Sequence, residues 1–217
     1  MPEYQLYCFA QSGNAYRAAL MLNLIGADWK PVYVDFFKGG ETRTPKYRSE
    51  VNEMGEVPVL CHGDKKLTQS GVILTYLSRH TGKFAPEGED EELEVLRWIL
   101  FDNHKFTSYF ATHRFMLSLA GKPADPHVLS FLRGRVEAAL AVADKHFADR
   151  AFVIGERPTI ADLSLAGYMF YPNAETGFDL KAYPAIDGWR GRLAAMKGFK
   201  PPYEMMPVGS DLRIQKP

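Results

Sequence analysis

GEVPVLCHGDKKLTQSGVILTYL, residues 55–77, is the stretch that decides the fold. Two short runs at 57–62 and 65–69 flank Gly63-Asp64, a turn signal, and together they predict an antiparallel β-hairpin. Ser70 is then expected to cap a helix. The inner side of that helix is expected to carry Val72, Ile73, Tyr76 and Leu77. The stretch therefore predicts two strands followed by a helix.

The residues before this stretch alternate between strand and helix signals. QLYCF (5–9) is a β-rich run, and residues 14–25 place apolar side chains at a helical spacing before Gly26, a typical C-cap. KPVYVDFF (30–37) predicts a second strand, and Thr44-Pro45 opens a short helix to about Val51. With the hairpin and its helix, the order is βαβαββα. That order predicts a small mixed sheet covered by helices, as in the thioredoxin-like fold.

The pattern changes after residue 83. Residues 84–90 are rich in Pro, Gly and acidic residues and are expected to form a linker. Thr159, followed three residues later by Asp162, predicts a capping box. The last twenty residues hold four prolines and are expected to form an irregular tail. We therefore expect an α/β domain over residues 1–83 and an all-α domain over 91–217. Its expected helices cover residues 91–120, 126–147, 159–171 and 184–196.

Composition limits the kinds of partner. The chain of 217 residues carries 26 basic and 26 acidic residues, so no net charge attracts nucleic acid or an anionic membrane. No apolar run approaches the roughly 20 residues of a membrane span, and the N-terminus lacks the features of a signal peptide. The two cysteines, Cys8 and Cys61, lie in strand-like runs. Two such thiols fit a reducing compartment, and we expect a cytoplasmic protein.

Two pairs of residues near the predicted hairpin, Val57-Pro58 and Gln69-Ser70, are candidates for ligand binding. Proline within a strand run, as at Val57-Pro58, marks an edge or, if the bond is cis, turns the Val57 backbone outward to pair with a peptide-like ligand. Cis bonds make up about 5–6% of X–Pro bonds, so these residues alone favour a trans proline. Gln69-Ser70 is usually a plain helix cap. The functional alternative is that Ser70 and the first N–H groups of the helix hold a carboxylate, with Gln69 assisting.

Ser12, in FAQSGNAYRA (9–18), lies at the start of the first helix. Its common role is an N-cap, with Gly13 easing the turn. Alternatively its hydroxyl donates a hydrogen bond to a substrate thiolate in the positive field of the helix. A hydrogen bond to a charged group contributes roughly 1.5–3 kcal/mol, which lowers a thiol pKa by about one to two units. One hydroxyl is therefore enough to make a thiol mostly thiolate at neutral pH.

Taken together, these motifs resemble a cytosolic glutathione S-transferase of a bacterial, serine-type or related class, and the resemblance covers nearly the whole chain. GEVPVL (55–60) is similar to the cis-proline loop of that family, and LTQSGVILTYL (67–77) to its γ-glutamyl-binding segment. ERPTIADLSLAGY (156–168) is similar to the capping box of its core helix, which is a structural motif.

The resemblance implies a role for each matching residue. The Val57 backbone would pair with the cysteinyl part of glutathione, with Pro58 cis beside it. Gln69 and Ser70 would hold the γ-glutamyl carboxylate and amine. Ser12 would activate the thiol, with Asn14 as a second candidate, because some bacterial members use an asparagine in this loop.

The resemblance also implies two more distant contacts and a second substrate. Lys38 would meet the glycyl carboxylate. The family commonly forms homodimers, and Asp102 is a match for an acid that reaches the partner's glutathione. The helical domain would line the pocket for a small apolar electrophile. Its candidate residues are Phe106, Tyr109, Phe110 and His113, with Arg114 and Met116 nearby, although more than half of these six are expected to be core or dimer contacts.

The sequence departs from the family pattern at positions that affect the expected glutathione contacts and the expected class. Residue 56 is Glu where many members carry a basic residue, and residue 69 is Gln where an acid is more frequent, so we expect weaker contacts to glutathione at both positions. Cys8 lies inside a strand, which disfavours the cysteine-dependent classes. His104 and His113 lack a third ligand at a sensible spacing, so we expect no metal cofactor.

The leading hypothesis is a detoxifying glutathione transferase that adds the glutathione sulfur to small hydrophobic electrophiles. A second hypothesis is glutathione-dependent reduction of disulfides or peroxides without an active-site cysteine. A third is a non-catalytic binding or assembly module built on the transferase fold.

Overall fold

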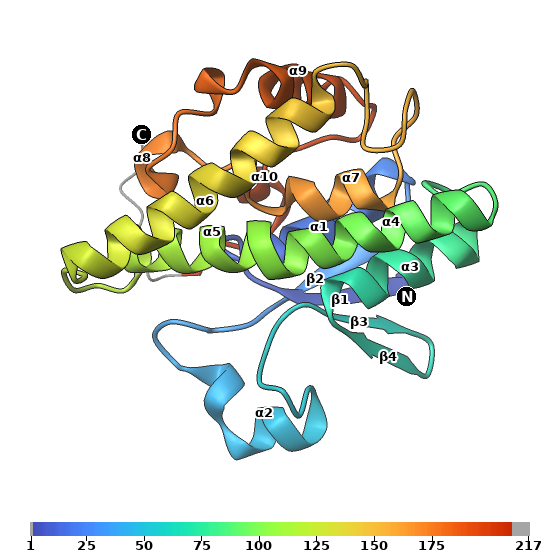
Figure 1. The fold of residues 1–217 in the computed structure, drawn as a ribbon. Coiled ribbons are helices and arrows are strands. Elements are labelled where there is room, and N and C mark those ends of the chain that lie inside the picture. The colour runs from blue at the N-terminus through green and yellow to red at the C-terminus, as the bar shows by residue number, and fades with distance from the viewer. Residues whose placement is uncertain (1, 210–217) are drawn as a thin grey trace. The chain divides into compact units, whose positions relative to one another are not determined.

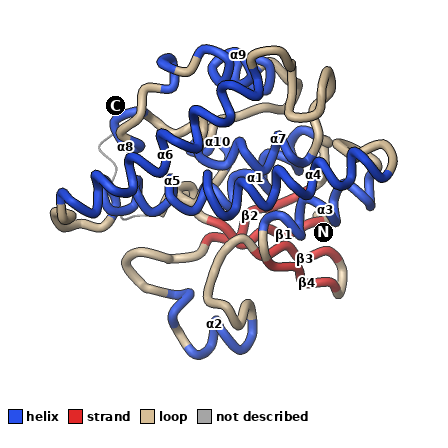
Figure 2. The backbone as a smooth tube through the Cα atoms, in the orientation of Figure 1, coloured by secondary structure: helices blue, strands red, loops and turns tan. Residues whose placement is uncertain are grey.

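The computed structural model describes residues 2–209, which divide into two compact units (Figures 1 and 2). The first unit comprises residues 2–83 together with 197–209, and the second comprises residues 84–196. The C-terminal segment is expected to belong to the helical domain, but its described part, residues 197–209, packs with the first unit. The Tyr16 hydroxyl donates to Lys200 O (2.9 Å), and Ala10 N donates to Pro207 O (2.9 Å). Residues 210–217 of the expected tail lie outside the described residues.

The first unit contains a four-stranded sheet with the order β2-β1-β3-β4, drawn in red in Figure 2. Strand β1 (Tyr4–Cys8) pairs in parallel with β2 (Trp29–Tyr33) through the crossover helix α1 (Gly13–Leu24). Strand β3 (Val59–His62) pairs antiparallel with both β1 and β4 (Lys65–Thr68). The thioredoxin-like fold and the hairpin are therefore confirmed.

The two faces of the sheet are covered differently, because successive side chains of a strand point to opposite faces. Tyr4, Leu6 and Cys8 of β1 are buried on the face that carries α1 and α3 (Ser70–Thr81). Tyr7 points the other way and packs against a cluster that includes Tyr47 of α2 (Pro45–Glu50). In Figure 1, α2 accordingly lies below the strands, apart from α1 and α3.

Two strands of the first unit are shorter than expected. Strand β2 ends at Tyr33 instead of residue 37, because Phe36 and Phe37 pack into the aromatic cluster around Phe9. Strand β3 begins only after Pro58, which has no N–H to donate to the sheet.

The start of helix α3 is also shifted from the expectation. The N-cap of α3 is Gln69, with a positive φ of 64°, so the expected Ser70 cap is wrong by one residue. Val72, expected on the inner side of the helix, is 52% exposed, and Leu74 is buried in its place.

The second unit is helical. The single expected helix over 91–120 is interrupted by two wider π-helical turns, Asp102–Phe106 and Phe115–Leu119. The remaining helices are α4 (Glu89–Phe101), α5 (Thr107–Arg114), α6 (Pro126–Phe147), α7 (Ile160–Leu165), α8 (Asn173–Thr176) and α9 (Pro184–Ala194). Helix α7 ends six residues earlier than expected and passes into a 3₁₀ turn, Ala166–Tyr168. The short helix α10 (Pro202–Met205) belongs to the first unit.

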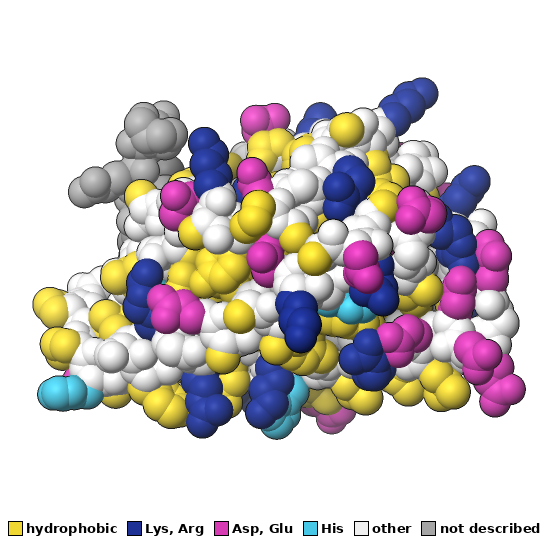
Figure 3. All heavy atoms as spheres, turned by 45° about the horizontal axis from the view of Figure 1, so that its top comes forward, with side chains coloured by type: hydrophobic (Ala, Val, Ile, Leu, Met, Phe, Trp, Pro, Cys, Tyr) yellow, Lys and Arg dark blue, Asp and Glu magenta, His cyan; other side chains and the backbone are white. Residues whose placement is uncertain are grey.

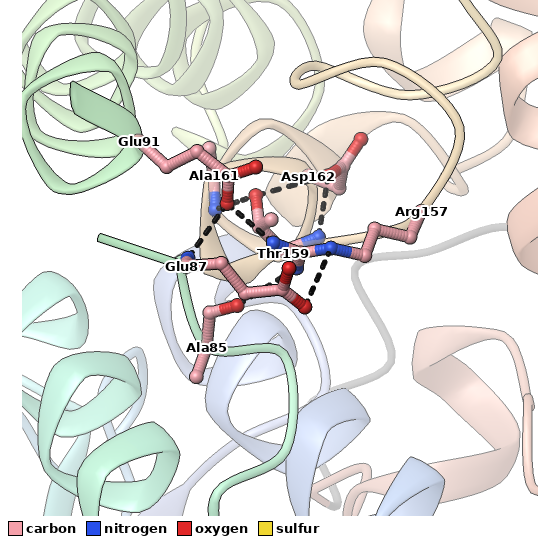
Figure 4. Close-up of polar contacts among 7 residues, drawn as sticks. All are labelled: Ala85, Glu87, Glu91, Arg157, Thr159, Ala161 and Asp162. Carbon is pink, nitrogen blue, oxygen red and sulfur yellow. Dashed lines mark hydrogen bonds and ion pairs between the residues drawn. The ribbon is translucent and has the colours of Figure 1, made fainter. Parts of the chain in front are cut away.

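The capping box at α7 is present as expected (Figure 4). Thr159 Oγ1 accepts from Ala161 N (3.3 Å), and Asp162 Oδ2 accepts from Thr159 N (2.7 Å). Asp162 Oδ1 also accepts from Val153 N (2.8 Å) and from the indole N–H of Trp189 (3.0 Å). Both oxygens of this buried carboxylate therefore accept hydrogen bonds from groups of the same chain.

The segment expected to be a linker, residues 84–90, is fastened to the helical unit beside this capping box (Figure 4). Arg157 donates to Ala85 O (2.8 Å) and pairs with both Glu87 and Glu91. Ile160 N donates to Phe84 O (3.0 Å). These contacts fix the segment against the helical unit.

The surface shows charges of both signs. On the face drawn in Figure 3, acidic and basic side chains are interspersed among hydrophobic ones. Within residues 2–209, the structure contains no helix that is long and apolar enough to cross a bilayer.

Candidate functional site

The N-terminus of α1 is an open, positively polarised helix end. Ser12 is its N-cap, and Ser12 Oγ accepts from Ala15 N (3.1 Å). A hydroxyl that accepts one hydrogen bond can still donate its own proton. Helix α1 has no acid in its first turn. The positive end of the helix is thus not neutralised by an acid of its own, and Ser12, 8% exposed, lies at that end. Asn14, the second residue of α1, is half-buried.

The Val57-Pro58 bond is cis, as the family resemblance implies. The preceding carbonyl, Glu56 O, accepts from the Tyr47 hydroxyl (3.0 Å) and from Asn52 Nδ2 (2.9 Å), which holds the loop in place. Val57 lies two residues before β3 begins. Among the described residues, the N–H and C=O of Val57 pair with no other backbone group. They are available to an extended ligand.

The N-terminus of α3 is a second helix end without an acid in its first turn. The exposed Gln69 side chain donates through Nε2 to Glu56 Oε2 (3.1 Å) and contacts Met54 Sδ (3.2 Å). Ser70 Oγ accepts from Arg17 Nη1 (3.3 Å). Arg17 is 0% exposed, so a buried positive charge lies directly behind this helix end.

Two residues of this site, Arg17 and Glu56, are not predicted by the sequence patterns. One feature of the sequence could have indicated Arg17. It is a charged residue between Tyr16 and Ala18, in a helix that contains no acidic residue, GNAYRAALMLNL. Such an arginine needs a partner from elsewhere, because burying a charge is costly unless it is hydrogen-bonded. Glu56 was noted only as a departure from the family pattern, and its contact with Gln69 depends on the loop around Pro58.

Two further residues, Lys38 and Asp102, are expected to contact glutathione. Lys38 is exposed on the loop after β2, and its backbone N–H donates to Asp35 Oδ1 (3.1 Å). Asp102 is fully buried, and its two oxygens accept from Thr107 Oγ1 and Ser164 Oγ, each at 2.6 Å. A carboxylate held inside the helical unit in this way cannot reach a partner chain, and the expected role of Asp102 is corrected to a structural one.

The expected electrophile residues are mostly core residues of the helical unit. Phe106, Phe110 and His113 are buried, whereas Tyr109 is half-buried. The Phe110 ring packs against Phe178, with centroids 5.2 Å apart. His113 Nδ1 lies 3.1 Å from Thr176 O, and burial lowers the pKa of this imidazole. These three side chains fill the core.

Neither cysteine is set up as a nucleophile. Burial raises the pKa of Cys8 to about 12, and burial also raises the pKa of Cys61. A nucleophilic cysteine needs the opposite shift. Thiol chemistry at this site therefore needs a thiol from a ligand.

Comparison with known proteins gives the family. Residues 2–79 match the N-terminal domain of glutathione S-transferases, and residues 126–192 match their C-terminal domain. The chain belongs to the glutathione S-transferase family. Glutathione S-transferase 3 of Zea mays is 27% identical over 96% of each chain. Maleylacetoacetate isomerase of Rhizobium meliloti is 30% identical over 91% of this chain and 94% of its own. The disulfide-bond oxidoreductase YfcG of Escherichia coli is 26% identical over 85% and 87%.

Solved structures of family members agree with this assignment. A possible glutathione S-transferase of Rhodopseudomonas palustris superimposes with a TM-score of 0.84 and 33% identity, over 92% of this chain and 98% of that one. A family member from Pseudomonas fluorescens, solved with two glutathione molecules bound, has a TM-score of 0.77 and 26% identity, over 89% of each chain. The relatives of this chain thus include proteins named as transferases, an isomerase and an oxidoreductase.

Proposed function

We propose that this protein is a glutathione transferase that stabilises the glutathione thiolate and adds it to small hydrophobic electrophiles. The observation that carries the proposal is the N-terminus of α1, where the Ser12 hydroxyl caps a helix end that has no acid in its first turn. An anion is favoured at such an end, because the unsatisfied N–H groups and the helix dipole both attract negative charge. The thiolate sulfur is the anion that this end would receive.

Glutathione would lie along the polar ends of the first unit. The Val57 backbone groups would pair with its cysteinyl part, as in an added strand. Ser70 and the N-terminus of α3 would hold the γ-glutamyl carboxylate, and the buried charge of Arg17 would strengthen that attraction. Glu56, 3.1 Å from Gln69, would receive the γ-glutamyl ammonium and supply the negative charge that residue 69 lacks. Lys38 remains the candidate for the glycyl carboxylate.

Catalysis would consist of thiolate formation and positioning. The Ser12 hydroxyl would donate to the sulfur and lower its pKa by roughly one to two units. The thiol proton would pass to solvent, and the thiolate would then attack the electrophilic carbon with its own electron pair. The pair of the bond that breaks would leave with the leaving group in a substitution, or move to the activating group of the electrophile in an addition, where a proton from water would complete the reaction. The enzyme forms no covalent bond in this sequence, and both cysteines lie outside it.

A second candidate is glutathione-dependent disulfide reduction, which the similarity to the oxidoreductase YfcG favours. The raised pKa values of Cys8 and Cys61 mean that such a reaction would use the bound glutathione thiolate and not an enzyme cysteine. Turnover of a glutathionylated disulfide, compared with that of an aromatic halide, separates the two reactions. A non-catalytic binding or assembly module is the alternative if glutathione does not bind.

We also propose a cytoplasmic homodimer that acts in detoxification. The support for a dimer is an apolar stripe on α4, where Leu93, Leu96 and Leu100 are 60%, 51% and 59% exposed. Their spacing places them on one side of the helix, and an exposed stripe of this kind is typical of an interface. The molar mass in solution tests it: Leu96→Glu should shift a dimer towards monomer, and a monomeric wild type would contradict the proposal.

The proposed reaction is tested by comparing Ser12→Ala with Asn14→Ala, using glutathione and an aromatic halide. Ser12→Ala should lower turnover about tenfold or more with little change in glutathione affinity, because the hydroxyl acts mainly on the charged sulfur. Asn14→Ala is the matched control and should retain most of the turnover. Unchanged turnover in Ser12→Ala, with loss in Asn14→Ala, would assign activation to Asn14 instead.

A further inference from the structure

Three side chains of types that can bind metal ions lie together at the end of β1 away from Ser12. The donor atoms of Glu3, His62 and His80 all lie within 4.8 Å of one another. Glu3 directly precedes β1, His62 ends β3, and His80 lies in the last turn of α3. Because Ser12 follows the other end of β1, roughly 13 Å of strand separates the two places.

The sheet register and ring packing hold this cluster together. Tyr4 pairs with His62 across the antiparallel strands, and their rings lie 4.4 Å apart. The His80 ring lies 4.9 Å from that of His62 and stacks on Tyr76 at 5.7 Å, one helical turn earlier in α3. The imidazoles are therefore positioned by neighbours in three different elements.

The hydrogen bond of His62 suits a metal ligand. Its Nδ1 lies 2.7 Å from the Tyr76 hydroxyl, and its Nε2 lies 3.6 Å from Glu3 Oε1. If Nδ1–H donates to the Tyr76 oxygen, Nε2 carries the lone pair on the side of Glu3 and His80. Metal-binding histidines almost always donate their second N–H to such a partner, which fixes the tautomer and the ring orientation.

We propose that Glu3, His62 and His80 bind a divalent transition-metal ion of the Zn²⁺ type. Two imidazoles and a carboxylate are typical ligands of zinc, which takes further positions from water. Bonds of about 2.0–2.2 Å in tetrahedral geometry put ligand atoms roughly 3.4 Å apart. The His62–Glu3 separation of 3.6 Å is already close to that value. Glu3 and His80 are exposed, so small rotations of their side chains can close the remaining gaps.

Such an ion would tie the start of β1, the end of β3 and the last turn of α3 together. It would stabilise the folded state, because the three ligands are far apart in the unfolded chain. It would leave the transferase reaction unchanged, since the cluster shares no residue with the proposed glutathione site.

The test is calorimetric titration of the untagged full chain with Zn²⁺ alone, alongside thermal unfolding with and without Zn²⁺. We expect one ion per chain and a higher Tm with Zn²⁺, but no shift with Mg²⁺, which prefers oxygen ligands. The double variant His62→Gln/His80→Gln should lose at least about tenfold in Zn²⁺ affinity and the Tm shift. Tyr76→Phe should weaken binding by up to about tenfold, because it removes only the hydrogen-bond partner of His62.

Two control variants separate this site from other zinc ligands. His127→Gln changes an exposed histidine of the helical unit and should bind Zn²⁺ like the wild type. Cys61→Ser removes the half-buried thiol next to His62, whose side chain points to the other face of β3, and should also leave binding unchanged. Equal Zn²⁺ affinity in the wild type and the double histidine variant would overturn the proposal, as would loss of binding in Cys61→Ser alone.

Discussion

Helices α1 and α7 both begin with a hydroxyl residue as the N-cap, but the charges around the two helix ends differ. Each has a hydroxyl N-cap, Ser12 or Thr159, that accepts a hydrogen bond from a backbone N–H of the first turn. At α7 the chain adds Asp162, whose buried carboxylate occupies the positive helix end and accepts from Thr159 N, Val153 N and Trp189. At α1 no acid follows the cap. The positive end of α7 is therefore satisfied by its own chain, whereas the end of α1 has no acid of its own and suits the anionic ligand proposed for it.

Helix α3 extends the comparison. It has no acid in its first turn and no side-chain cap, and Arg17 adds a buried positive charge behind Ser70. The first unit thus presents two helix ends without an acid in the first turn, which would suit two of the three negative groups of glutathione, the thiolate and the γ-glutamyl carboxylate. In the helical unit, the carboxylate of Asp162 neutralises the positive end of α7, and that helix end has a structural role.

The largest expected effect is a loss of stability when Asp162 is removed from the start of α7. Asp162→Ala leaves the donors of Thr159, Val153 and Trp189 buried without an acceptor, and each such group costs about 1–3 kcal/mol. We expect a loss of roughly 3–5 kcal/mol in the free energy of unfolding, measured by urea denaturation. Asp90→Ala, at the exposed start of α4, is the control and should cost at most about 1 kcal/mol. A small loss for Asp162→Ala would mean that α7 does not depend on its carboxylate.

The pH dependence of stability sharpens the same point. Burial raises the pKa of Asp162 to about 6, against the opposing effect of its hydrogen bonds from Thr159, Val153 and Trp189. The folded chain therefore binds this proton more tightly than the unfolded chain, in which an aspartate titrates near 3.9. The contribution of Asp162 to the free energy of unfolding should fall as pH rises from about 4 to about 6 and stay constant above that. Denaturation of the wild type and of Asp162→Asn across this range isolates it, and a parallel pH dependence in both would contradict the shift.

Removing each N-cap in turn separates its effect on stability from its effect on turnover. Ser12→Ala and Thr159→Ala each remove an N-cap, which costs about 0.5–2 kcal/mol of stability. Turnover per folded molecule should fall about tenfold only in Ser12→Ala, because only that hydroxyl is proposed to donate to the glutathione sulfur. Thermal unfolding and steady-state kinetics on both variants give the answer. Equal turnover in the two would remove the distinction between the helix ends.

The smallest expected effect concerns the open end of α3. Glu56→Gln removes the charge proposed to receive the γ-glutamyl ammonium beside Gln69. Because exposed ion pairs contribute about 0–1 kcal/mol, the KM for glutathione should rise about two- to fivefold with kcat nearly unchanged. Glu53→Gln, an exposed acid of the same loop, should have no effect. A lower KM in Glu56→Gln would show that this charge repels glutathione.

The sequence predicts those parts of the molecule that depend on local rules. Asp125 and Thr159 start helices where they are expected, because a cap needs only its own first turn. Gln69 displaces the expected Ser70 cap because its φ is positive, which the residue type does not favour. Contacts between distant segments, such as Asp102 with Ser164 or Arg17 with Ser70, are set by packing. For the same reason the cluster of Glu3, His62 and His80 is invisible in the sequence.

The most direct test of thiol activation by Ser12 is a pH titration of the thiolate absorbance of glutathione bound to the wild type and to Ser12→Ala. We expect the thiol bound to the wild type to titrate roughly one to two pH units below free glutathione, and Ser12→Ala to remove most of this shift while still binding glutathione. An unshifted thiol in the wild type, or an equal shift in Ser12→Ala, would contradict it.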